Sequence, residues 1–130
     1  MSLASAHMLI GTGLIHCGFG LAVPELREPL LRTITQGTIE VADTADRYQR
    51  ECAFWFQFGG VVLVAQGCLL RSYCRATGLP PPAWLGWFLT GVSALSVVVM
   101  PQSGFWLVSG QGLYMLYQNR SSKTAAKKLE

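Results

Sequence analysis

His16 and Glu51 are the side chains in this sequence whose types could carry out acid–base chemistry beside long apolar segments. An imidazole and a carboxylate can exchange protons with a bound molecule when both lie next to it. We therefore predict a proton-transfer pair, with His16 and Glu51 as the candidate catalytic residues. Two simpler interpretations stay open. The pair could be a hydrogen bond that holds two helices together, or Glu51 could pair with Arg47, one helical turn before it.

A second group of polar and aromatic residues could line a site for a flat, apolar molecule. The predicted ligand-binding residues are Thr12, Trp55, Gln102, Ser103 and Trp106. Thr12 and His16 are four positions apart, so they share one face of a helix. The alternative for the aromatic residues is ordinary packing with anchoring at the membrane interface. Serine hydrolysis fits poorly, because no third group that would orient Ser103 and His16 is evident.

Other kinds of site are disfavoured by the residue types that the sequence offers. The only histidines, His7 and His16, fall on opposite faces of one helix, which argues against a haem held by two histidines and against a histidine-rich metal site. The four cysteines include no C-x-x-C pair of the kind that disulfide oxidoreductases use. We expect no metal and no cofactor. No nucleic-acid-binding module is recognisable, so we expect no nucleic-acid partner.

These residues are carried by long stretches that contain no charge. The 130-residue chain is 51% hydrophobic and 13% charged, whereas soluble domains are about 25% charged. Asp, Glu, Lys and Arg are absent from residues 1–24, 52–70 and 76–119. A bilayer excludes charge, and a helix needs about 20 apolar residues to cross it. The sequence therefore predicts an all-α fold, a bundle of four transmembrane helices at residues 3–23, 44–70, 83–100 and 105–119.

The polar residues 24–50 join the first two predicted helices. Within them, Pro29–Gln36 reads as a short amphipathic segment, with Pro29 at the first helical position and Gly37 at the exit. We expect this segment to lie on the membrane surface, where it could also act as a lid. Asp43 or Thr44 is the predicted cap of the second long helix.

Residues 1–120 are predicted to form the four-helix transmembrane domain, and residues 121–130 a disordered basic tail that touches anionic headgroups. Four crossings return the chain to its starting side. That side would carry Arg71, Arg75 and the tail, so the positive-inside rule places both termini of this multi-pass protein in the cytoplasm. At the other face, the ends of the predicted helices would bring the candidate catalytic and ligand-binding residues together in one leaflet.

Two segments, ECAFWFQFG at residues 51–59 and MPQSGFWL at residues 100–107, accompany a histidine near the end of the first helix. Together they resemble an uncharacterised family of small four-helix membrane proteins found in bacteria and fungi. The resemblance spans roughly residues 3–118 and implies the four-helix fold without implying an activity. A looser likeness in architecture alone exists to sterol isomerases and related ligand-binding proteins.

Three functions are compatible with these observations. The first is an integral membrane protein that binds a lipophilic small molecule in a bundle pocket; as an enzyme it would be a cofactor-independent isomerase or cyclase, with Glu51 as acid or base and His16 as its partner. The second is a structural or interaction subunit that packs against another membrane protein or itself, favoured by Gly104, Gly110 and Gly112. The third is a small oligomeric transporter, disfavoured by the scarcity of charge. The expected partners are the lipid bilayer, a lipophilic molecule and a second copy of the chain.

Overall fold

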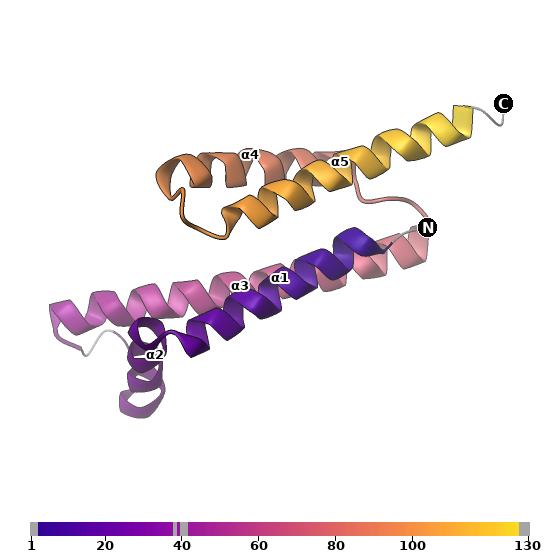
Figure 1. Cartoon of the computed structure of the whole chain (residues 1–130). Helices are drawn as coiled ribbons and strands as arrows, with labels where there is room; N and C mark the ends of the chain where they lie inside the picture. The colour runs from indigo at the N-terminus through magenta and orange to yellow at the C-terminus, as the bar shows by residue number, and fades with distance from the viewer. Residues whose placement is uncertain (1–2, 38, 40–41, 128–130) are drawn as a thin grey trace. The chain divides into compact units, whose positions relative to one another are not determined.

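The computed structural model describes residues 3–37, 39 and 42–127, and these residues form five helices and no strand. The helices are α1 (Ala4–Ala22), α2 (Pro24–Gln36), α3 (Thr44–Thr77), α4 (Ala83–Val99) and α5 (Phe105–Lys127) (Figure 1). The predicted all-α fold is confirmed. The bounds of α1 and α4 agree with the expected ones to within a residue, whereas α3 and α5 continue beyond the expected ends.

The segment 121–130, expected to be a basic tail, is described only in part. Helix α5 includes its first residues, whereas residues 128–130 lie outside the described part of the chain. The disorder of this tail stays a prediction.

Helix α2 begins earlier than expected, and the placement of Pro29 at its first position was wrong. Pro24 takes that place, where its missing N–H costs no hydrogen bond. Val23 precedes it in an extended conformation, as a residue before proline prefers, and its carbonyl accepts from the N–H groups of Leu26 and Arg27 at 3.1 and 2.9 Å. Pro29 is buried inside the helix. The predicted exit is right, because Gly37 adopts φ +93°, a conformation that favours glycine.

The expected cap of α3 is also present. Oδ1 of Asp43 accepts a hydrogen bond from the backbone N–H of Asp46 at 3.0 Å. A carboxylate at this position satisfies one of the N–H groups that the first turn of a helix leaves without a partner.

The chain divides into two compact units, one formed by Gly11–Ala65 and the other by Met1–Ile10 with Gln66–Glu130. In the unit Gly11–Ala65, α1 and α3 run antiparallel with their backbones in close approach. A Cβ atom placed on Gly13 would lie 2.7 Å from the carbonyl oxygen of Gly60 and 2.8 Å from the nitrogen of Val64. Because a real Cβ does not fit at these distances, glycine permits this separation of the helices.

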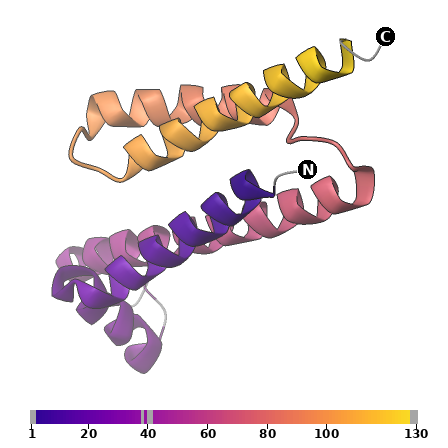
Figure 2. The ribbon, with the colours of Figure 1, turned by 45° about the vertical axis from the view of Figure 1, so that its right-hand side comes forward.

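In the other unit, α4 and α5 form an antiparallel pair (Figures 1 and 2). A Cβ atom on Gly86 would lie 3.0 Å from the carbonyl oxygen of Gly112, and one on Gly112 would lie 2.9 Å from that of Gly86. The hydroxyls of Ser93 and Ser109 lie 2.7 Å apart and join the same two helices. Small residues thus bring this pair together as well.

Two of the described helices, α1 and α3, are long and apolar enough to cross a membrane. In their most apolar windows 28% and 22% of the residues are buried, whereas the core helix of a soluble protein is mostly buried. Helix α4 is apolar but shorter, with 17 residues. Large apolar side chains on it face outward, including Leu95, Val98 and Val99. An all-α chain with two candidate membrane spans is therefore what the structure supports.

Candidate functional site

His16 lies where α1 packs against α3, within the unit Gly11–Ala65. Its Nε2 atom lies 2.9 Å from the carbonyl oxygen of Phe56, and the two rings stack with their centroids 3.9 Å apart. A carbonyl oxygen can only accept a hydrogen bond, so Nε2 must carry the hydrogen. In the neutral imidazole, Nδ1 then holds a lone pair and is a hydrogen-bond acceptor.

Two further hydrogen bonds cross between the same helices. Nε2 of Gln57 donates to the carbonyl oxygen of Cys17 at 3.3 Å, and the thiol of Cys17 donates to the carbonyl oxygen of Gln57 at 3.8 Å. A Cβ atom on Gly20 would lie 2.9 Å from Oε1 of Gln57, so the glycine makes room for this amide. We call these residues, together with Gly60, the α1–α3 seam: His16, Cys17 and Gly20 on α1, and Phe56, Gln57 and Gly60 on α3.

Glu51 has a different partner from the one first considered. Its Oε1 accepts from Nε of Arg47 at 2.9 Å, which is the four-residue pairing left open by the sequence, and its side chain is 36% exposed. His16 instead bonds Phe56, more than one turn farther along α3. Near the polar start of α3, the Glu51 carboxylate stays partly hydrated while it pairs with Arg47. Moving this carboxylate into the seam would remove its water, which costs free energy. The structure therefore brings Glu51 to Arg47 rather than to His16, and their catalytic roles stay predictions.

Two other predicted site residues belong to the same unit. Thr12 lies half-buried, one turn before His16 on α1. Trp55 is 63% exposed and contacts Phe54 and Phe58 edge to face, with centroids 5.4 and 5.6 Å away. These three aromatic residues contact one another and form an exposed cluster on α3.

Gln102, Ser103 and Trp106 belong to the other unit, at the turn between α4 and α5. The hydroxyl of Ser103 donates to the carbonyl oxygen of Met100 at 2.6 Å, and the indole N–H of Trp106 donates to that of Pro101 at 2.9 Å. Gln102 is exposed. Ser103 and Trp106 thus bond backbone groups of their own turn. The convergence of these three residues with His16 stays a prediction.

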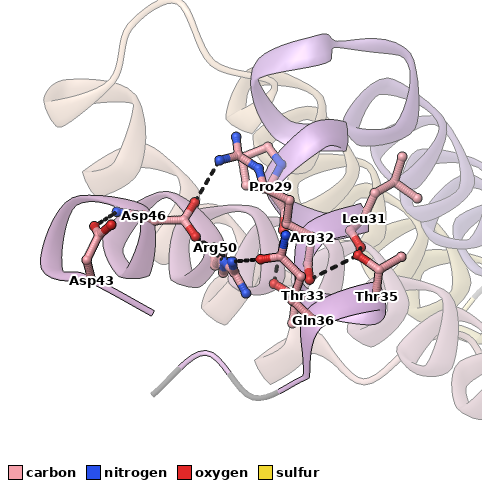
Figure 3. A network of polar contacts seen from close by, with 9 residues as sticks. All are labelled: Pro29, Leu31, Arg32, Thr33, Thr35, Gln36, Asp43, Asp46 and Arg50. Carbon is pink, nitrogen blue, oxygen red and sulfur yellow. Dashed lines mark hydrogen bonds and ion pairs between the residues drawn. The ribbon is translucent and has the colours of Figure 1, made fainter. Parts of the chain in front are cut away.

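A network that sequence reasoning missed fixes α2 against the start of α3 (Figure 3). The carboxylate of Asp46 accepts from Nη1 of Arg32 at 2.9 Å and from Nε of Arg50 at 2.6 Å. Arg50 is only 4% exposed and also donates to Oε1 of Gln36. The four-residue spacing of Asp46 and Arg50 was a usable signal for one of these contacts.

Gln57 is one of the seam residues that the predicted site did not include. It is a polar residue within an apolar stretch of α3, and that alone could have indicated an interhelical hydrogen bond.

Comparison with known proteins shows that the chain matches a family whose function is unknown. The model of a family of unknown function, DUF6463, matches residues 2–122. No curated protein and no solved structure matches the chain. The expectation of an uncharacterised family is confirmed.

Proposed function

We propose that this chain, which belongs to the family of unknown function DUF6463, is a multi-pass membrane protein that binds a lipophilic small molecule at the α1–α3 seam. The observation that carries the proposal is the half-buried imidazole of His16 within a helix apolar and long enough to cross a membrane. Ionisable residues are rare in such helices because they are costly there, and those that occur commonly serve a function.

The aromatic rings beside His16 suit an apolar ligand. Phe56 stacks on the imidazole, and Phe19 lies 6.2 Å from Phe56 between ring centroids, with 57% of its surface exposed. A molecule that enters from the bilayer would contact these rings and the imidazole edge together. Small-molecule sites are lined mainly by apolar and aromatic side chains, with a few polar groups that orient the ligand.

Binding is better supported than catalysis. An isomerase or cyclase that uses proton transfer needs an acid and a base on the substrate. Glu51, the proposed acid or base, is engaged with Arg47, so catalysis would require that ion pair to open first.

Four membrane crossings are part of the proposal. The 17 residues of α4 span about 25 Å at 1.5 Å per residue, close to the shortest length that crosses a bilayer. Because α5 packs antiparallel to α4, the two would cross as a hairpin. The chain after residue 70 carries six Lys or Arg residues (Arg71, Arg75, Arg120, Lys123, Lys127 and Lys128), whereas residues 24–50 carry four (Arg27, Arg32, Arg47 and Arg50). This excess of basic residues favours a cytoplasmic position for both termini.

The crossing of α4 and α5 is tested with single cysteines in a variant that lacks the four native ones. The substitutions Leu79→Cys and Ser103→Cys mark the turns before α4 and after it. With a membrane-impermeant maleimide, we expect the two positions to be labelled from opposite sides of the membrane. Labelling of both from the same side would mean that α4 does not cross.

Ligand binding is tested by native mass spectrometry of the detergent-purified chain, followed by extraction of the small molecules that accompany it. We expect a defined lipophilic compound, near one per chain, that is lost in His16→Ala and retained in His7→Ala, a matched change on the same helix. A chain that carries no compound, or that keeps it in both variants, would contradict a site at the seam.

A second function, an interaction subunit, is favoured by glycines whose surface is open in the described part of the chain. A Cβ atom on Gly11, Gly18, Gly104 or Gly110 would meet no described residue beyond its own helical turn within 4 Å. Glycines with this freedom let another helix approach closely. Under this function, Gly18→Leu would change the oligomeric state in detergent without lowering the stability of the chain.

A further inference from the structure

We infer that the ligand of the α1–α3 seam is a neutral lipophilic molecule with a hydroxyl group, which donates a hydrogen bond to Nδ1 of His16. The inference rests on the proposed binding function and adds the chemical class of the ligand.

Each donor atom of the seam already makes a hydrogen bond. The imidazole N–H, the Cys17 thiol and the Gln57 amide nitrogen all donate to backbone carbonyl oxygens of the facing helix. Because Nε2 of His16 is held by Phe56, the histidine cannot turn its N–H toward a ligand without losing that bond. Toward a ligand, the imidazole ring of His16 therefore presents a hydrogen-bond acceptor, Nδ1.

Acceptors are left over at the same place. Within the described part of the chain, no residue donates to Nδ1 of His16, and Oε1 of Gln57 is buried without a hydrogen-bond partner. A polar atom without a partner in an apolar surrounding costs free energy, and a bilayer core has no water to supply one. A ligand with an O–H group would complete the hydrogen bonding of the imidazole.

The charges near the seam favour a neutral ligand over a cationic one. An amine in hydrocarbon needs a carboxylate beside it. Glu51 is held by Arg47, and Asp46 is held by Arg32 and Arg50. The apolar rings of Phe19 and Phe56 would contact the rest of the molecule.

The test uses two photoreactive probes that differ only in the donor: a sixteen-carbon alcohol with a diazirine group on its chain, and its methyl ether. The full-length protein in liposomes is irradiated with each probe. The labelling displaced by excess hexadecanol is then mapped to peptides of α1 and α3 by mass spectrometry. One neutral hydrogen bond corresponds to a preference of roughly three- to tenfold for the alcohol.

The variants separate this hydrogen bond from a general effect on packing. His16→Phe keeps a ring that can stack on Phe56 and removes both ring nitrogens, so it leaves no acceptor at this position, and we expect the preference to fall close to one. His7→Phe should leave the preference unchanged. If His16→Phe does not fold, as judged by circular dichroism, the comparison of alcohol and ether in the unaltered protein decides the question.

Each result has a distinct meaning. Equal displaceable labelling by both probes, or a preference that survives in a folded His16→Phe protein, would overturn the hydroxyl inference while the binding function stands. No displaceable labelling of α1 or α3 by either probe would overturn both.

Discussion

Replacement of Gly13 by alanine should separate α1 from α3. The added methyl group would lie 2.7 Å from the carbonyl oxygen of Gly60, and ordinary contact begins at 3.4 Å. The helices would therefore have to part locally by about 0.7 Å, and overpacking of this kind costs about 1–3 kcal/mol of unfolding free energy. The hydrogen bond between His16 and Phe56, one turn away, would lengthen as well.

Gly11→Ala is the matched control on the same helix. A Cβ atom there meets no described residue beyond its own helical turn within 4 Å. Alanine favours a helix over glycine by about 1 kcal/mol, so Gly11→Ala should be neutral or stabilising. The measurement is the free energy of unfolding in mixed micelles titrated with dodecyl sulfate, followed by circular dichroism. Equal stability of Gly13→Ala and Gly11→Ala would refute the close backbone approach as a source of stability.

Two further predictions concern the polar contacts. Asp46→Asn leaves the buried guanidinium of Arg50 without its carboxylate and should cost about 2–4 kcal/mol of unfolding free energy. Glu51→Gln removes an exposed ion pair and should cost less than about 1 kcal/mol of unfolding free energy. If Asp46→Asn and Glu51→Gln lost equal stability in the same dodecyl sulfate titration, the burial of the contact between Asp46 and Arg50 would be contradicted. The hydroxyls of Ser93 and Ser109 should show a coupling free energy of about 0.6 kcal/mol in a double-mutant cycle with alanine. Additive losses would mean that the two hydroxyls do not bond each other.

The sequence predicted the helices well where local residues set their ends. Pro82 and Pro101 bracket α4, and its expected bounds were nearly correct. The start of α2 was missed because residues 24–28 were assigned only to the polar connection after the first helix. A proline that ends one helix can also occupy the first position of the next, where its missing N–H is tolerated. The predicted end of α3, near residue 70, was too early. The helix continues through Arg71 to Thr77 and is followed by Gly78 at φ +70°.

The candidate site was less predictable, for a physical reason. The partner of His16 is a backbone carbonyl, and every residue carries one, so no residue type marks it in the sequence. The partner of Glu51 is a side chain four positions away, which the spacing had identified as an alternative. Side-chain pairs within one helix can be read from a sequence, whereas bonds from a side chain to the backbone of another helix require the packed structure.

The contacts along the α1–α3 seam also limit how the chain length can vary. Gly60 faces Gly13, while Phe56, one turn earlier on α3, faces His16. A single residue inserted between Phe56 and Gly60 would rotate one contact by about 100° relative to the other, so both could not form together. Related chains can therefore differ in length between α2 and α3 or between α3 and α4, but this turn of α3 should accept substitutions without accepting insertions or deletions.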